Sequence, residues 1–359
     1  MRVSIVTEPL HGNCGGVLEN YALQQILKGW GHSPITLNYM PSLSVGRYIL
    51  YVCKALLCIP FPSLRHSIKP YKRYLSRPPL VDAFIRNNIT LTEVIPRYTE
   101  RLLKKVHTEV IVVGSDQVWR YAYNKRSLED MFLAFAKNYN CLKTTYAASF
   151  GLTTLDYPPK SEKRIKKLIK QFQAISVREE SGVSLCWNKF GVEAVTVLDP
   201  TLLLQPSVYE QFCVYPESGS SPYLAAYVLD MSKEKSEYIK AVAQAKGLSI
   251  QLLRITNGDF SIEKWLSIIR FADFVITDSY HGSIFSILFE RQFQTIINRK
   301  RGSDRFITLF NKLDIQDRLL ESTNLTFCSN TVIDYSRVSR LLKSLREESL
   351  LYLQSSLSV

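Results

Sequence analysis

The sequence lacks several features that would indicate whole classes of protein. Its seven cysteines are scattered along 359 residues without a Cys-x-x-Cys pair, which argues against a disulfide framework and a cysteine-ligated metal. Reducing cytoplasm is therefore the expected compartment. No run of about twenty apolar residues occurs, so no membrane-spanning helix is expected. Residues 1–7 read as a short strand and not as a signal peptide.

Common nucleotide-binding and nucleic-acid-binding motifs are also missing. The first glycine loop, at residues 12–16, reads Gly-Asn-Cys-Gly-Gly and fits neither G-x-G-x-x-G nor a Walker loop. No zinc-finger spacing, RNA-recognition aromatic motif or basic coiled coil is present. The net charge of +13 nevertheless implies an acidic partner, which can be a phosphorylated substrate, an anionic membrane or nucleic acid. Nucleic acid is the weakest of the three choices, although charge alone leaves an RNA-binding protein open.

The sequence does contain an alternation of short β-branched runs with helical patterns, which is the signature of βαβ units. Strands are predicted at 3–7, 34–39, 109–114, 144–149, 174–177 and 194–198, with helices at 17–28, 160–171 and 179–188. After a linker-like run at 216–222, strands follow at 223–229, 249–254, 274–277 and 293–298, with helices at 234–246, 262–271 and 283–290. We therefore predict an α/β protein with Rossmann-like domains at 1–213 and 214–333 and a C-terminal helix at 334–359.

One segment is typical of contact with a membrane surface. An apolar run at 48–61 is interrupted by Lys54 and is followed by a basic, tyrosine-bearing stretch that ends at Arg77. A short apolar run beside basic residues resembles a monotopic surface element. A helix buried between the domains, with a solvated basic flank, explains the same pattern equally well.

The most informative stretch begins at a buried strand, residues 274–277. The strand ends at 278–282, where His281 precedes an apolar helix, and after one more strand comes a basic loop at 299–305. In α/β folds ligands bind at the carboxyl ends of the strands, so both loops are expected to face one crevice. A proton carrier beside a cluster of cations suits an anionic, phosphorylated substrate. The alternative is a capping histidine near a solvated loop.

Other strand ends carry polar residues. The glycines at 12–16 let the backbone approach a ligand, and the following helix offers its N-terminus to a phosphate. Asp116 and Gln117 could take sugar hydroxyls while Trp119 stacks on the ring, or the same residues could form an Asx turn with a core tryptophan. Arg178 reads either as a guanidinium oriented for an anion or as half of a surface salt bridge.

Several motifs, in order along the chain, resemble those of the polysaccharide pyruvyl transferase family. They are GNCG (12–15), YALQ (21–24), GSDQVW (114–119), SFG (149–151), SVRE (176–179), LDPT (198–201), DSYHG (278–282) and RGSDRF (301–306). The resemblance covers most of the chain. It implies a two-domain fold like that of the B-type glycosyltransferases, and transfer of pyruvate from phosphoenolpyruvate onto two hydroxyls of one sugar.

The resemblance also implies roles for single residues, with His281 and Arg178 as the catalytic pair. The expected donor-binding residues are Arg178, Ser279, His281, Gly282, Lys300, Arg301 and Arg305. The expected acceptor-binding residues are Asn13, Cys14, Gly15, Gly16, Glu19, Asp116, Gln117, Trp119 and Ser149. No metal and no cofactor is expected. The partners expected are phosphoenolpyruvate and a saccharide, lipid-linked and met at the inner face of the membrane, with contact through 48–77.

The chain departs from the family pattern in two places. Many members read Arg-Leu-His where this chain has Ser279, Tyr280 and His281, so one phosphate-binding arginine is missing and Arg301 or Arg305 is expected to supply that charge. Some members carry acidic residues just after the second glycine of the first loop. This chain has no carboxylate there, and the base for the acceptor stays open. A nucleotide-sugar glycosyltransferase of the same fold and a non-enzymatic scaffold in polysaccharide assembly are the alternative functions.

Overall fold

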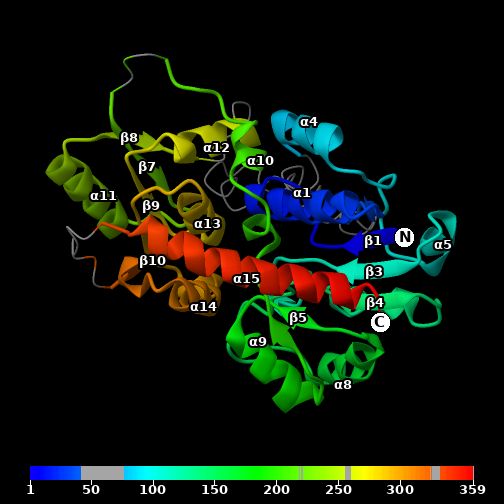
Figure 1. Ribbon diagram of the computed structural model, residues 1–359. Coiled ribbons are helices and arrows are strands. Elements are labelled where there is room, and N and C mark those ends of the chain that lie inside the picture. The colour runs from blue at the N-terminus through cyan, green and yellow to red at the C-terminus, as the bar shows by residue number, and fades with distance from the viewer. Residues whose placement is uncertain are drawn as a thin grey trace, which may run out of the picture.

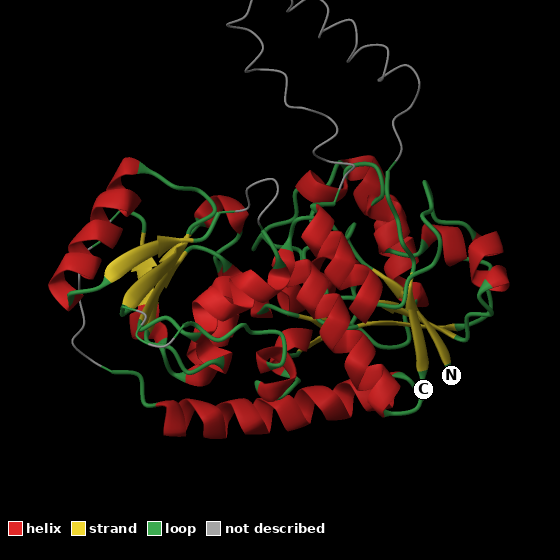
Figure 2. Ribbon diagram, turned by 90° about the horizontal axis from the view of Figure 1, so that it is seen from above, coloured by secondary structure: helices red, strands yellow, loops and turns green. Residues whose placement is uncertain are grey.

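The computed structural model describes residues 1–41, 77–217, 219, 221–254, 260–323, 325 and 332–358. Two parallel sheets, each flanked by helices, lie side by side, and a long helix, α15 (Tyr335–Ser356), runs back across both of them (Figure 1). Figure 2 shows this helix along one side of the molecule, with the two chain termini close together. The prediction of an α/β protein with two Rossmann-like halves is confirmed.

The first sheet has the strand order β2-β1-β3-β4, and all its pairs are parallel. Its strands are β1 (Arg2–Val6), β2 (Ser33–Thr36), β3 (Val110–Val113) and β4 (Leu142–Thr145). All four residues of β3 are buried and apolar, as expected of a strand that helices cover on both faces. A short parallel pair, β5 (Ser176–Val177) and β6 (Val195–Thr196), follows beside β4.

The helices of the first half surround this sheet. They are α1 (Cys14–Gly29), α4 (Pro79–Asn88), α5 (Glu100–Lys105), α6 (Tyr121–Asn124), α7 (Leu128–Met131), α8 (Pro159–Leu168), α9 (Glu180–Leu185) and α10 (Ser207–Glu210). The sequence predicted α1, α8 and α9. It missed α4 and the short helices. These helices have few turns and many polar residues, so the helical spacing of their apolar residues is hard to recognise in the sequence.

The second sheet has the order β11-β10-β9-β7-β8 and is also parallel. Its strands are β7 (Tyr223–Tyr227), β8 (Ser249–Leu252), β9 (Phe274–Thr277), β10 (Phe293–Ile297) and β11 (Leu319–Glu321). The helices are α11 (Lys233–Lys246), α12 (Ile262–Arg270), α13 (Tyr280–Leu288) and α14 (Asp304–Leu313). Serines cap three of these helices, each accepting a backbone N–H of the first turn: Ser232, Ser261 and Ser279.

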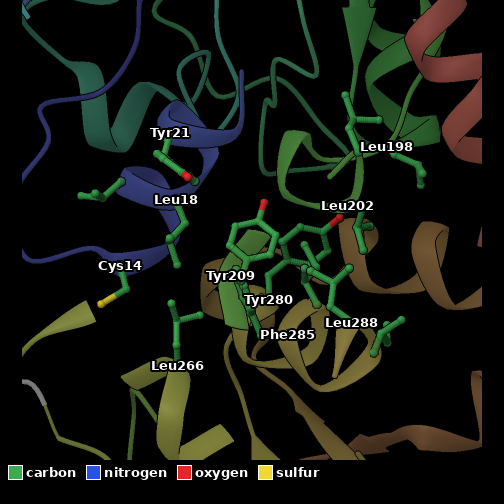
Figure 3. Close-up of a cluster of buried hydrophobic side chains, with 14 of the residues drawn as sticks. Cys14, Leu18, Tyr21, Leu198, Leu202, Tyr209, Leu266, Tyr280, Phe285 and Leu288 are labelled. Carbon is green, nitrogen blue, oxygen red and sulfur yellow. The ribbon is translucent and has the colours of Figure 1, made fainter. Parts of the chain in front are cut away.

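The two halves share one hydrophobic core. Leu18 and Tyr21 of α1 and Tyr209 of α10 pack toward Phe285 of the second half (Figure 3). The Phe285 ring meets the Tyr209 ring edge-on, with 5.0 Å between the centroids. Such aromatic pairs add about 0.5–1.5 kcal/mol to the free energy of burial, so the contact holds the halves in a defined position.

Polar contacts fix the same junction. The backbone N–H of Ser181, at the start of α9, donates to Asp304 Oδ2 at 3.2 Å, and that of Glu180 donates to Thr308 Oγ1 at 3.3 Å. Ser349 of α15 also accepts the N–H of Leu198, at 3.0 Å. Helix α15 therefore returns to the first half and ties it to the second.

Strand β11 and helix α14 were not predicted, and the predicted elements differ from the observed ones at several of their ends. The strand expected at 144–149 ends at Thr145, because Ala147 takes a positive φ of 54° and interrupts the ladder; Ala148 still forms single bridges to Asp116 and Val177. Helix α13 begins at Tyr280, so His281 lies in its first turn and not in the preceding loop. The expected membrane-surface segment 48–77 falls outside the described residues except for Arg77. Within the described part of the chain, no helix is long and apolar enough to cross a membrane.

The two halves also touch through bare backbone. Gly302 has a φ of 93°, and a Cβ built on it would lie 2.1 Å from the carbonyl oxygen of Gly151. Gly151 has a φ of 68°, and a Cβ there would lie 2.0 Å from Gln117 Oε1. Both positions therefore require glycine for the backbone angle and for the space.

Gly302→Ala is expected to destabilise the protein more than Gly191→Ala. Gly191 has a φ of 67° with nothing within 4 Å of a built Cβ, so its variant incurs only the backbone strain, about 1–2 kcal/mol. Gly302→Ala adds a collision with the Gly151 backbone and should cost at least twice as much. Urea unfolding measures both, and equal losses of unfolding free energy would show that the halves are not in contact at this point.

Candidate active site

A cavity of about 410 Å³ lies between the carboxyl ends of the two sheets. The first half contributes Glu8, Gly12, Asn13, Asp116, Gln117 and Tyr123. The second half contributes Tyr227, Leu229, Ser279, Tyr280, His281, Arg301 and Arg305. This is where ligands bind in open α/β sheets, and the cavity is large enough for a small ligand.

Two helix N-termini meet at this cavity. Asn13 precedes α1 and Ser279 precedes α13, and both residues line the wall. Asn13 does not cap α1, because its Nδ2 donates instead to Asp116 Oδ2 at 2.9 Å. A Cβ built on Gly15, in the first turn of α1, would lie 1.9 Å from His281 Nδ1. The two partial positive charges of the helix ends therefore face one space, which favours an anion.

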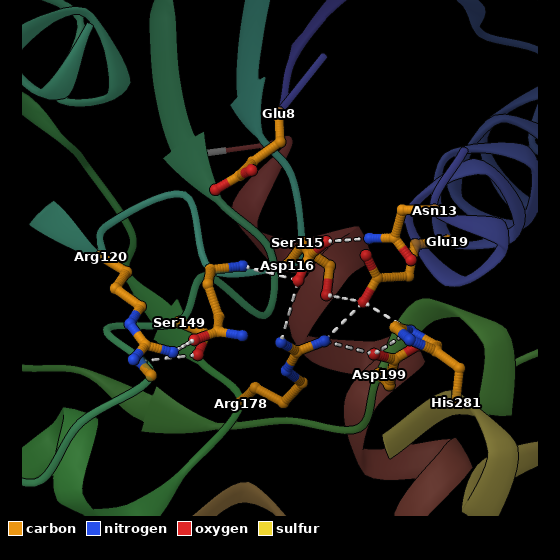
Figure 4. A network of polar contacts seen from close by, with 12 residues as sticks. Glu8, Asn13, Glu19, Ser115, Asp116, Arg120, Ser149, Arg178, Asp199 and His281 are labelled. Carbon is orange, nitrogen blue, oxygen red and sulfur yellow. Dashed lines mark hydrogen bonds and ion pairs between the residues drawn. The ribbon is translucent and has the colours of Figure 1, made fainter. Parts of the chain in front are cut away.

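A fully buried arginine organises the floor beneath the cavity. Arg178 Nη1 donates to Glu19 Oε1 at 2.5 Å and to Asp199 Oδ2 at 2.8 Å, and its Nη2 lies 3.6 Å from Asp116 Oδ1 (Figure 4). Burial disfavours the cation, but Glu19 and Asp199 outweigh it and raise the pKa of Arg178. The guanidinium thus joins α1, the end of β3 and the segment after β6.

His281 completes this cluster. Its Nε2 lies 3.1 Å from Glu19 Oε1 and 3.6 Å from Asp199 Oδ2. Burial opposes protonation, but Glu19 and Asp199 raise the pKa of His281 to about 9. Burial and the neighbouring carboxylates of Asp199 and Asp116 also raise the pKa of Glu19 to about 8. The titrations of the two groups are therefore linked, because an ionised Glu19 favours the protonated form of His281.

The same three residues have the composition of a metal site. One ligand atom each from Glu19, Asp199 and His281 lie within 4.8 Å of one another. The Arg178 Nη1 atom, however, already contacts both carboxylates. A guanidinium supplies the positive charge that these oxygens need, so the cluster fits an ion-pair network better than a metal.

Arg305 is the cation that lacks such compensation. It is 8% exposed and lines the cavity, and within the described part of the chain its guanidinium makes no ion pair. It packs on the Tyr280 ring at 5.1 Å from the centroid, and Arg178 packs on the same ring at 4.8 Å. Burial and the nearby Arg178 lower the pKa of Arg305. A buried cation without a partner is costly, which an anionic ligand would relieve.

Arg301 enters the cavity with a partner already bound. Its Nε and Nη2 donate to the two carboxylate oxygens of Asp230 at 2.7 and 3.0 Å. Asn298 Nδ2 donates to the same carboxylate at 2.5 Å. Hydrogen bonding from Arg301 lowers the pKa of Asp230 to about 2. The bidentate pair holds the Arg301 side chain in place and leaves part of it in the cavity wall.

Glu8 is a cavity residue that the sequence analysis missed. Its Oε1 accepts a hydrogen bond from Asn124 Nδ2 at 2.8 Å, and burial together with Asp116 raises the pKa of Glu8 to about 8. Glu8 lies just beyond the end of β1, as Asp116 lies beyond β3. A polar residue after a buried strand was therefore the signal that could have found it.

Seven of the expected binding residues line the cavity: Asn13, Asp116, Gln117, Ser279, His281, Arg301 and Arg305. Arg178 and Glu19 do not, because both belong to the buried cluster beneath it. The expectation of direct ligand contact through these two side chains is thereby corrected. The side chain of Lys300 is outside the described part of the structure.

Other expected acceptor-binding residues are structural. Trp119 is fully buried, with its ring stacked on Phe132 at a centroid distance of 4.8 Å, so the prediction that it stacks on a sugar is wrong. Ser149 is also fully buried and donates its hydroxyl to Glu179 Oε1 at 2.8 Å. Cys14 lies in the core shared by the two halves. Gly15 and Gly16 are buried and serve close packing, and the same holds for Gly282, which was expected in the donor site: a Cβ on Gly282 would meet Thr277 Oγ1 at 2.3 Å.

Comparison with known proteins adds a family and a fold. The family model described as polysaccharide pyruvyl transferase matches residues 13–298. No curated protein sequence matches the chain. A glycosyltransferase from Rickettsia africae ESF-5 is similar in structure, with 11% identity and a TM-score of 0.50 over 99% of this chain and 94% of that one. A UDP-GlcNAc 2-epimerase from Methanocaldococcus jannaschii has 12% identity and a TM-score of 0.49, over 96% and 92%. At such identities the likeness concerns the fold alone.

Arg178→Met is expected to lower the free energy of unfolding by about 3–5 kcal/mol, because it leaves buried carboxylates without their cation. The loss should be larger at pH 9 than at pH 6, since Glu19, with a pKa of about 8, takes up a proton as the pH falls. Arg164→Met is the control: its ion pair with Glu129 is exposed, and its loss should cost less than about 1 kcal/mol. Urea unfolding at both pH values measures this, and a loss independent of pH would contradict the electrostatic explanation.

Proposed function

The chain belongs to the polysaccharide pyruvyl transferase family, and on that premise we propose that it transfers pyruvate from phosphoenolpyruvate to two hydroxyls of one sugar, forming a cyclic ketal. The proposed acceptor is a lipid-diphosphate-linked saccharide, used in the synthesis of a surface polysaccharide at the inner face of the membrane. The first half would hold this acceptor and the second half would hold the donor.

One observation carries the proposal: Arg305 is a nearly buried cation in the cavity wall without an ion-pair partner among the described residues. A ligand that brings a negative charge would provide the missing partner. Phosphoenolpyruvate carries two anionic groups, a carboxylate and a phosphate. Each hydrogen bond between such a group and a cation contributes about 1.5–3 kcal/mol.

The cavity offers matching groups for both anions. Arg301 and Arg305 lie in its wall, His281 is held protonated near neutral pH, and the N-terminus of α13 faces the same space. Many family members have a phosphate-binding arginine where this chain has Ser279. In this proposal Arg305 and Arg301 supply that positive charge. Arg178 does not contact the donor in this proposal. It positions His281 indirectly, because it holds Glu19 and Asp199 against that side chain.

The reaction needs one proton on carbon and one on the departing phosphate. Glu8, with a pKa of about 8, holds a proton near neutral pH and would give it to the methylene carbon of the donor. The first sugar hydroxyl then forms a bond to C2 of the donor and returns its proton to Glu8. His281 protonates the phosphate as its bond to C2 breaks, and the second hydroxyl closes the ring while its proton restores His281. The products are the ketal and inorganic phosphate.

Arg305→Ala and Arg301→Ala are expected to weaken phosphoenolpyruvate binding by about tenfold or more, because each removes a charged hydrogen-bond donor. Arg299→Ala is the matched control, since Arg299 belongs to the same turn but is paired with Glu321 outside the cavity. Isothermal calorimetry gives the three dissociation constants. Wild-type protein that binds no phosphoenolpyruvate, or an Arg299 variant as weak as the other two, would refute the donor site.

Glu8→Gln is expected to lower kcat by about a hundredfold or more, the usual contribution of a general acid, while the affinity for the donor stays the same. In the wild type the rate should fall as the pH rises through about 8, because Glu8 then loses the proton that it must donate. Phosphate release at pH 6 to 10 measures the profile. A Glu8→Gln variant with a wild-type rate would assign the acid to another residue.

A further inference from the structure

We propose that Tyr123 is the platform on which the acceptor sugar stacks, and that Tyr123, Gln117 and Glu8 together form the saccharide subsite. The inference rests on the proposed pyruvyl transfer and identifies the surface that would hold its acceptor. Trp119 was the aromatic residue expected in this role, but its ring is enclosed in the core. Tyr123 follows it by four residues and reaches the cavity wall.

Among the tyrosines that line this cavity, Tyr123 alone offers a ring face of useful size. Its exposed fraction is 47%, whereas Tyr227 and Tyr280 are 5% and 3% exposed. The guanidinium of Arg120 covers one face of the Tyr123 ring, at 4.5 Å from the centroid. We assign the opposite face to the sugar.

The ring is fixed before any ligand binds. Arg120 Nη1 donates to Tyr123 Oη at 3.2 Å and to Gln117 Oε1 at 2.6 Å. The next residue along the chain, Asn124, donates to Glu8 Oε1 at 2.8 Å and to the carbonyl of Val118 at 3.0 Å. These bonds join the platform to the polar residues beside it, so little conformational entropy remains to be lost on binding.

The composition of this wall fits a pyranose. A pyranose presents an apolar C–H face surrounded by hydroxyls, and aromatic rings with a few well-placed polar groups typify cavities for such amphipathic ligands. The C–H face would lie on Tyr123, while hydroxyls reach the Gln117 amide and the Glu8 carboxyl. Asp230 raises the pKa of Arg301, and Tyr123 adds to that shift, so the ring lies near the proposed donor site.

The test compares Tyr123→Ala, Tyr123→Phe and Tyr215→Ala in the full chain. Tyr215 is 75% exposed and does not line the cavity, so its variant controls for loss of a surface tyrosine. Saturation-transfer NMR with the methyl β-pyranosides of glucose, galactose and mannose reports sugar binding, and calorimetry reports phosphoenolpyruvate binding. Tyr123→Ala should weaken the sugar by about tenfold. Tyr123→Phe should weaken it less, because it keeps the ring and loses only the hydrogen bond from Arg120, and Tyr215→Ala should match the wild type. Donor affinity should be unchanged in all three.

Three results would overturn the subsite: a Tyr123→Ala variant that binds sugars as the wild type does, a Tyr123→Phe variant as weak as Tyr123→Ala, or a wild type that binds none of the three sugars. If phosphoenolpyruvate still binds in any of these cases, the donor site and the proposed function stand without this platform. Wild-type protein that binds sugars through Tyr123 but binds no phosphoenolpyruvate would instead remove the proposed function and keep the saccharide subsite.

Discussion

The buried guanidinium of Arg178 is the interaction on which the site depends. It neutralises carboxylates that come from three separate places in the first half, on α1, after β3 and after β6. Without a cation at this point those side chains could not remain buried together, since each unpaired charge costs several kcal/mol. The same carboxylates hold His281 of the second half and keep it protonated. One arginine thus sets both the position and the charge of the central histidine.

Two arginines pack on one tyrosine ring but differ in their ion pairs. Arg178 and Arg305 both pack on Tyr280, yet only Arg178 has ion-pair partners in the described residues. A fully compensated cation stabilises the fold and has little left to offer a ligand. An uncompensated one raises the energy of the empty cavity and lowers the cost of binding an anion. The division of structural and binding roles follows from the placement of the carboxylates.

The sequence predicted the parts of the fold and site that obey local rules. Buried β-branched runs marked the strands, and polar residues just after them led to Asp116, His281 and Arg301, because parallel strands deliver their ends to one edge. Glu19 was not predictable in its true role, since it lies inside a helix and meets Arg178 only through tertiary packing. Trp119 was misassigned for a related reason. A tryptophan after a strand can turn inward or outward, and the surrounding rings decide which.

The backbone contact between Gly151 and Gly302 has a consequence for how such a protein can diversify. Because glycine backbone sets the separation of the halves at this point, the width of the crevice does not depend on the length of any side chain there. Residues of the first-half wall can then be exchanged during evolution while the distance to the cationic wall stays constant. The contact acts as a fixed spacer between the two walls of the cavity.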